Sequence, residues 1–279
     1  LNRYCGQHKT SGYLNLLPYS NFSDSQTIAK KVKEAIITRM NAEKMDEISS
    51  LYIGLIPNIK KIKDFSTILN ELSRTAIEKM ISCEENCENA LEEIFNLDDN
   101  DKNIILNFKK NQPEIKLPIS DINSINDFIW FSSHSVISYL LGTTLGRWDI
   151  RFATGVKEAP TLPDPFDPLP VCPPGMLQNG DGLPAEPNDV PKSYPLRISW
   201  QGILVDDEGH KEDIVARVRE AMEVIWKENA GDIEEEACGI LGIRSLREYF
   251  AKPGSFFADH LKRYSKSRRQ APIYWPLST

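Results

Sequence analysis

A run of basic side chains near the C-terminal end carries the clearest chemical signal in this sequence. Five of its eight positions are cationic, with serine and tyrosine hydroxyls between them: Lys262, Arg263, Tyr264, Ser265, Lys266, Ser267, Arg268 and Arg269. Arginine and lysine neutralise phosphates, serine donates hydrogen bonds to phosphate oxygens, and a tyrosine ring packs against a sugar or base. The run therefore favours a nucleic-acid contact, although a basic surface loop without a ligand has the same composition.

Motifs of catalysis and cofactor binding are missing. The Gly-rich turn that admits S-adenosylmethionine follows a strand, whereas Gly142 and Gly146 lie within a helical pattern. The segment 172–175, Cys-Pro-Pro-Gly, lacks the Asn or Asp and the aromatic residue that hold a target amino group. The Walker lysine loop, the His-Glu-x-x-His motif and the Gly-x-Ser-x-Gly motif are also absent. We therefore expect no catalytic residue in this chain.

An acidic cluster offers a second possible chemistry. Asp206, Asp207, Glu208 and His210 could chelate a divalent cation, because hard cations bind clustered carboxylates. Acidic residues just before a helix that begins near Glu212 are also expected from capping and from the helix dipole. We favour capping and expect no metal site.

Apolar residues recur at helical spacing along most of the chain. A helix after Asp24 and a longer one over 61–95 are expected to form an antiparallel hairpin or coiled arm. The remaining expected helices are 124–146, 212–228, 233–241, 245–249 and 255–264. His134 lies among apolar neighbours in one of them, which is typical of a buried core histidine.

The segment 153–195 holds most of the eighteen prolines, and it separates the expected helices before residue 147 from those after residue 211. Its apolar residues predict an ordered connector pinned to a surface: Leu162, Phe166, Leu169, Val171, Met176, Leu177 and Leu183. Short strands are expected at 12–18, 196–200 and 202–206.

These patterns predict an α+β fold that is predominantly helical, with a helical arm and a C-terminal helical region wrapped by the proline-rich connector. The expected divisions are the tail of an upstream domain, a helical region with the arm, the connector and a mostly helical region with the basic run: 1–22, 23–152, 153–195 and 196–279. The chain opens without methionine and ends just after an apolar run, which indicates a piece of a longer protein.

The composition and net charge of the chain exclude some classes of protein. The chain has 279 residues, 41% of them hydrophobic, and a net charge of −7, which argues against indiscriminate coating of nucleic acid. The stretch 84–101 has eight acidic residues and no basic one. Five scattered cysteines without a Cys-x-x-Cys pair favour a reducing compartment, and signal and membrane-spanning segments are missing. We expect a cytoplasmic protein with no membrane partner.

Several segments of the second half resemble one family in order and spacing: 146–151, 162–166, 173–176, 202–207 and, above all, 260–279. The chain from Gly146 onward resembles the C-terminal region of large adenine-specific DNA methyltransferases, those of BREX-type phage defence and related Eco57I-like restriction-modification enzymes. The arm ending near 94–102 resembles the helices that follow a target-recognition domain in this family. By that resemblance, 1–22 is the tail of such a domain.

The resemblance implies that the parent protein transfers a methyl group from S-adenosylmethionine to adenine N6 in double-stranded DNA, with the base flipped into an upstream catalytic domain. This chain would position the DNA and needs no cofactor of its own. The implied phosphate contacts are Lys262, Arg263, Lys266, Arg268 and Arg269, with Tyr264 beside them. Arg147 and Arg151 form a weaker second patch, unless they pair with Asp149 or Asp164.

Two alternatives remain. The acidic arm could be a protein-interaction module that docks other subunits of a restriction or phage-defence complex. The chain could also be part of a fused restriction endonuclease and methyltransferase, whose nuclease would lie elsewhere in the parent. An interaction module would show an apolar patch on the arm and no salt-dependent DNA binding.

Overall fold

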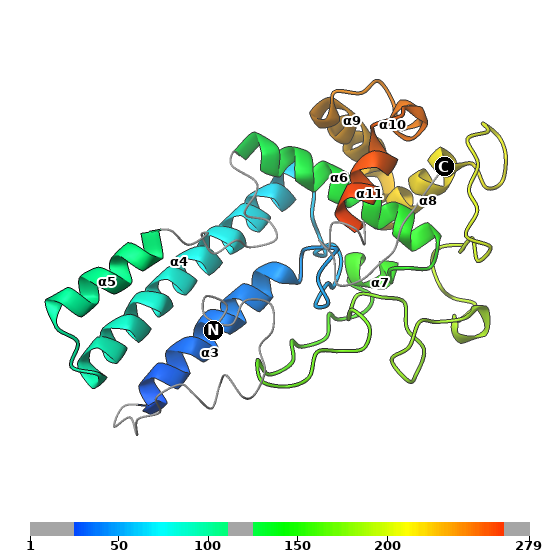
Figure 1. Ribbon diagram of the computed structural model, residues 1–279. Coiled ribbons are helices and arrows are strands. Elements are labelled where there is room, and N and C mark those ends of the chain that lie inside the picture. The colour runs from blue at the N-terminus through cyan, green and yellow to red at the C-terminus, as the bar shows by residue number, and fades with distance from the viewer. Residues whose placement is uncertain (1–24, 111–124, 265–279) are drawn as a thin grey trace.

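The computed structural model describes residues 25–110 and 125–264, and within these ranges the chain is predominantly helical. The α-helices are α3 (Ser25–Glu43), α4 (Ile62–Ile94), α5 (Asp99–Lys110), α6 (Ile125–Thr144), α7 (Ile150–Ala153), α8 (Ile214–Trp226), α9 (Ala230–Leu241), α10 (Leu246–Ala251) and α11 (Phe256–Tyr264). Short 3-10 turns occur at Pro187–Asp189 and Lys227–Asn229. Figure 1 shows α3, α4 and α5 projecting as an arm from a cluster of the other helices. The predominantly helical fold expected from the sequence is confirmed.

The arm is built on an antiparallel pair, as the apolar spacing predicts. Helices α3 and α4 lie side by side (Figure 1), and the fully buried Ala42 and Ala76 pack at their contact with Leu72 and Met80 around them. Small residues let two helix backbones approach closely. Helix α5 then turns back along α4, and the Lys102 ammonium lies 3.3 Å from the Glu92 carboxylate.

Helix α6 forms the centre of the core. It packs against α4, α8 and α9, and almost every side chain from 132 to 144 is buried, including Tyr139 and Leu140 at 0% exposure. Several of its buried hydroxyl groups bond to the helix backbone: Ser132 donates to the Phe128 carbonyl at 2.7 Å, and Thr143 donates to the Leu140 carbonyl at 2.7 Å. One apolar cluster joins the base of the arm to the C-terminal helices. The proposed division into segments at 152 and 195 stays a prediction.

The proline-rich connector lacks α-helices over 154–195. Only some of the apolar residues that were expected to hold it on the surface are buried. Met176 and Leu177 are buried, and Met176 forms an isolated antiparallel bridge with Trp148. In contrast, Phe166 and Val171 are 70% and 88% exposed. The prediction that apolar residues pin the whole segment was therefore wrong for these positions, and also for Leu169 and Leu183, which are 62% and 47% exposed.

The strands expected at 196–200 and 202–206 do not pair with each other. Gly202, at φ +69°, closes a turn in which its amide donates to the Ser199 carbonyl at 2.9 Å. The Ser199 amide donates to Thr144 and the Val205 amide to Glu212, so each piece binds a different part of the chain. In residues 25–110 and 125–264 the extended pieces form isolated bridges and no sheet. The strand expected at 12–18 lies outside the described residues.

The buried His134 gives a pH-dependent stability. Its Nδ1 lies 2.7 Å from the Tyr249 hydroxyl, and its ring stacks on Trp130. Burial lowers the pKa of His134 well below its usual value, and the charges of Arg263 and His260 lower it further. The folded state therefore resists protonation, whereas the unfolded state binds a proton below about pH 6.5. Above that pH the protonation of His134 does not affect the free energy of unfolding. Below it, proton binding by the unfolded state lowers the free energy of unfolding.

We expect the free energy of unfolding to fall below pH 6.5, with His134 contributing up to about 1.4 kcal/mol per pH unit. Urea unfolding between pH 7.5 and 5 measures this, and a His134→Gln variant should show a shallower decline than the wild type. Equal declines in the two proteins would show that His134 does not titrate in this way.

Candidate nucleic-acid interface

The last turn of α11 carries the first residues of the basic run. Lys262 is exposed, whereas Arg263 is 15% exposed at its side chain and Tyr264 is 1% exposed. Cations in the last turn of a helix also lie favourably in the helix dipole. Lys266, Arg268 and Arg269 lie outside the described residues. The structure thus brings the described part of the run to one helix end, with only Lys262 of these three side chains facing solvent.

Arg263 is held by acidic residues of the loop after α3. Its Nη2 donates to Asp46 Oδ1 at 2.9 Å, and its Nη1 lies 3.8 Å from Glu47 Oε2. The guanidinium also lies over the Phe131 ring, with Cζ 4.8 Å from the ring centroid. Asp46 and Glu47 are themselves 2% and 1% exposed. The guanidinium of Arg263 is therefore bound by groups of the protein itself.

Arg263 and Asp46 shift each other's pKa. Burial lowers the pKa of Arg263, but the charges of Asp46, Glu47, Tyr264 and Tyr52 together raise it by more, so the net shift is upward. Burial raises the pKa of Asp46 more than the charge of Arg263 lowers it. Arg263 is therefore a cation held by two carboxylates, which makes it an anchor for α11.

Glu47 connects the end of α11 to the segment after α6. The Tyr264 hydroxyl donates to the Glu47 carbonyl at 3.1 Å, and Trp148 Nε1 donates to Glu47 Oε1 at 3.2 Å. The Tyr264 ring also stacks on His260 with centroids 4.6 Å apart. Tyr264 is therefore a second anchor beside Arg263, and the last turn of α11 is fixed on the loop after α3.

The second predicted patch is a compact charge cluster around Asp149. Arg151 binds this carboxylate with two donors, at 2.9 and 2.7 Å, and Lys157 lies 3.2 Å from it. Burial raises the pKa of Asp149, but the hydrogen bonds from Arg151 and Lys157 lower it below its usual value. Asp149 therefore binds both cations, and this group of one carboxylate and two cations retains a net positive charge.

Arg147, the other residue of the second predicted patch, packs on the neighbouring Trp148. Its guanidinium carbon is 4.9 Å from the Trp148 ring centroid. Burial lowers the pKa of Arg147, and the nearby Tyr264 and Glu47 offset part of this shift. Arg147 is thus partly withdrawn from solvent, whereas Arg151 and Lys157 keep 24% and 42% side-chain exposure.

The sequence did not reveal Asp46 and Glu47 as partners of the basic run. They lie 217 positions from Arg263 and Tyr264, in a loop without any motif. The acidic cluster before α8 also differs from the expectation. The N-cap is Asp213, which accepts from the Ala216 amide at 3.1 Å, while Asp206 pairs with Arg247. In the described part of the chain, no group of three or more His, Cys, Asp or Glu side chains is placed to hold a metal ion.

No helix within 25–110 or 125–264 is long and apolar enough to cross a membrane. No protein-family model matches the chain, and no solved structure does. A similar curated protein is the adenine-specific methyltransferase BrxX of Escherichia coli O9:H4 (strain HS), which is 24% identical over 225 residues. The match covers 72% of this chain and 16% of that protein, so the chain spans about one sixth of its relative's length. This distant similarity supports a relationship to adenine-specific methyltransferases.

Proposed function

We propose that this chain binds and positions double-stranded DNA for an adenine-N6-specific, S-adenosylmethionine-dependent methyltransferase of a restriction or phage-defence system. The observation that carries the proposal is the fixed start of the basic run. Arg263 and Tyr264 are anchored on Asp46 and Glu47, so the cations next to them start from a defined position. Fixed phosphate contacts set the register of a protein on a duplex.

In this proposal the predicted residues divide into two roles. Lys262, Lys266, Arg268 and Arg269 neutralise phosphates, whereas Arg263 and Tyr264 hold the end of α11 in place. The positive cluster of Arg151 and Lys157 around Asp149 is a weaker second contact, with Arg147 packed beside it. Contacts at two separate places on the protein would fix the orientation of the duplex as well as its position.

Methyl transfer belongs, in this proposal, to the parent protein outside this chain. S-adenosylmethionine binds where a glycine-rich turn follows a strand, and residues 25–110 and 125–264 contain isolated bridges instead of a sheet. The distant relative is itself named an adenine-specific methyltransferase, and this chain spans about one sixth of its length. The contribution of this chain is the orientation of DNA relative to the catalytic domain.

Salt-dependent binding tests the proposal. We expect this chain to bind a mixed-sequence duplex, measured by fluorescence anisotropy, with an affinity that falls linearly as log[salt] rises. Four phosphate contacts would give a slope of about −3.6, since each contributes about −0.9. A folded chain that shows no binding at 50 mM salt would contradict the proposal.

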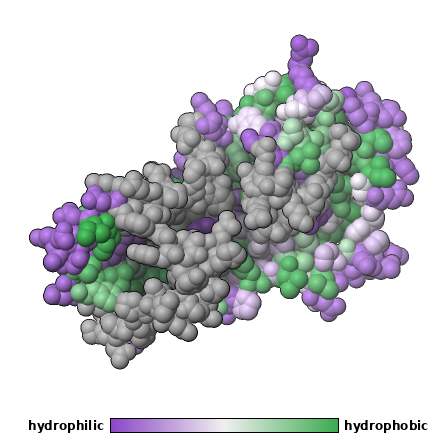
Figure 2. Space-filling model, viewed as in Figure 1, coloured by the Kyte–Doolittle hydropathy of each residue, from purple (hydrophilic) through white to green (hydrophobic). Residues whose placement is uncertain are grey.

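One observation favours a second candidate, a protein-interaction module. The outer end of the arm exposes apolar side chains beside acidic ones, and Figure 2 shows apolar surface bordered by polar surface there. The exposed apolar residues are Ile81, Leu91, Phe95, Ile104, Ile105 and Leu106, with Ile104 at 60% and Leu106 at 53% exposure. Exposed apolar groups with a charged rim are typical of protein docking surfaces. Absence of DNA binding would make this module, docking a basic and apolar surface of another defence subunit, the better account.

A further inference from the structure

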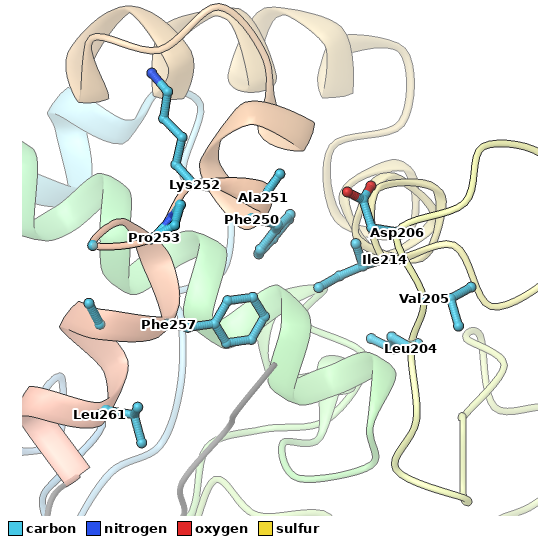
Figure 3. A pocket seen from close by; sticks show the side chains of 12 residues that line it. Leu204, Val205, Asp206, Ile214, Phe250, Ala251, Lys252, Pro253, Phe257 and Leu261 are labelled. Atoms are coloured by element: carbon cyan, nitrogen blue, oxygen red, sulfur yellow. The ribbon is translucent and has the colours of Figure 1, made fainter.

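An apolar groove lies between α10, α11 and the loop before α8. It encloses about 580 Å³. Figure 3 shows the apolar side chains of Leu204, Ile214, Phe250, Phe257 and Leu261 around it. The only charged side chains that line it are those of Asp206 and Lys252, among the residues that the structure describes. A cavity of this volume is within the range that holds a small ligand or a few side chains.

The groove has a buried floor and an open rim. Ile214 and Phe250 are 6% and 3% exposed, whereas Leu261 is 39% exposed and Phe257 is half-buried. Asp206 pairs with Arg247, and Lys252 pairs with Glu248 at one side. The charges at the rim are therefore neutralised locally. What remains is an apolar surface, and covering it with another apolar group lowers the free energy.

The chain itself supplies a segment that fits this groove. Leu261 lines the groove three residues before the last residue of α11, Tyr264, and the chain continues for another fifteen residues outside the described ones. Its last ten residues carry no charge and include Ala271-Pro272-Ile273-Tyr274-Trp275-Pro276-Leu277. Trp275 lies eleven positions after Tyr264, and eleven extended residues reach up to about 36 Å, more than a groove of this size requires. Two prolines restrict the backbone, so ordering the segment costs less entropy.

We propose that the segment 271–277 folds back and docks in this groove, with Ile273 and Trp275 covering its apolar rim. Aromatic side chains bury large apolar areas, and the uncharged segment matches the uncharged interior of the groove. The basic residues Lys266, Arg268 and Arg269 then form a loop fixed at both ends, by Tyr264 and by Trp275. This deepens the proposed function, since a loop held at two points presents its cations in one arrangement, but docking itself needs no DNA.

A double-mutant cycle in the 279-residue chain tests the docking. The variants are Phe257→Ala, Trp275→Ala and the combination, and the readout is the melting temperature. We expect each single substitution to lower it by several degrees and the double variant to lose clearly less than the sum, because both changes remove one contact. Trp200→Ala, a 40% exposed tryptophan that does not line the groove, should instead be additive with Phe257→Ala. Additive losses for Trp275→Ala as well would overturn the proposal.

Two further measurements distinguish docking within one chain from docking between copies, and docking from DNA binding. Coupling between Phe257 and Trp275 that stays constant over a hundredfold range of protein concentration supports docking within one chain. Coupling that rises with concentration would assign the groove to another copy's segment and overturn the proposal. The salt slope of DNA binding is measured separately on wild type, so a chain that shows the coupling without binding DNA would retain this inference and remove the proposed function.

Discussion

Replacing Arg263 with alanine is expected to lower the free energy of unfolding by about 3–5 kcal/mol. The substitution leaves Asp46 and Glu47, which are 2% and 1% exposed, without the cation that faces them. A buried carboxylate without a partner costs several kcal/mol, a large part of the 5–15 kcal/mol that typically stabilises a domain. Urea unfolding at pH 7, followed by circular dichroism, measures the loss.

The adjacent Lys262 provides the matched control. Lys262→Ala removes one positive charge from the same helix turn, but its side chain is exposed, so the change should stay within about 0.5 kcal/mol. Similar losses for the two variants would contradict the anchoring role of Arg263. If Arg263→Ala were as stable as wild type, Arg263 would be free to act as a direct phosphate contact.

Replacing Gly175 with alanine is expected to cost about 3 kcal/mol or more. An added Cβ would lie 2.7 Å from the Ile53 Cα and closer still to the Ile53 carbonyl, so the backbone would have to move. That movement would disturb two hydrogen bonds, from the Gly175 amide to the Tyr52 carbonyl at 2.7 Å and from the Asp149 amide to the Gly175 carbonyl at 2.9 Å. Thermal unfolding of the purified variant measures the effect.

A second glycine separates this clash from a general effect of alanine. Gly231 lies in the first turn of α9, and a Cβ there would meet nothing within 4 Å. Gly231→Ala should therefore stabilise the protein by about 0.5–1 kcal/mol, since alanine loses less backbone entropy in a helix. A neutral Gly175→Ala would show that the connector does not pack against residue 53 as described.

The helices could be predicted where apolar residues recur at helical spacing and face one core. Helix α4 was expected over 61–95 and spans Ile62–Ile94, and α6 was expected over 124–146 and spans Ile125–Thr144. Helix α5 was not predicted. Its side chains Ile104, Ile105 and Leu106 are all exposed, so α5 is not held in place by burial of these apolar residues in the core.

The strands and the connector were harder to predict for a different reason. A short apolar piece becomes a strand only when a partner strand lies beside it, and the Ser199 amide instead binds the Thr144 carbonyl at 2.8 Å. The connector shows the same dependence on tertiary contacts. Phe166 and Met176 look equally suited to burial in the sequence, yet one is 70% and the other 5% exposed.

For the candidate interface, the sequence predicted which residue types matter but not which of them face solvent. The basic run was visible from composition, whereas the pairing of Arg263 with Asp46 joins positions 217 apart. The alternative considered for Arg151, pairing with Asp149, is what the structure shows. Solvent exposure of a charged side chain depends on such distant partners, and spacing along the chain does not encode it.

If the cations beside the Arg263 and Tyr264 anchors bind DNA, two variants that lose the same number of charges should bind DNA differently. In one, Lys262, Lys266, Arg268 and Arg269 become alanine, and in the other the exposed Lys60, Lys79, Lys192 and Lys211 do. Both lose four positive charges. We expect only the first variant to weaken duplex binding and to flatten the salt slope, by about 0.9 for each lost phosphate contact. Equal salt slopes in the two folded variants would contradict it.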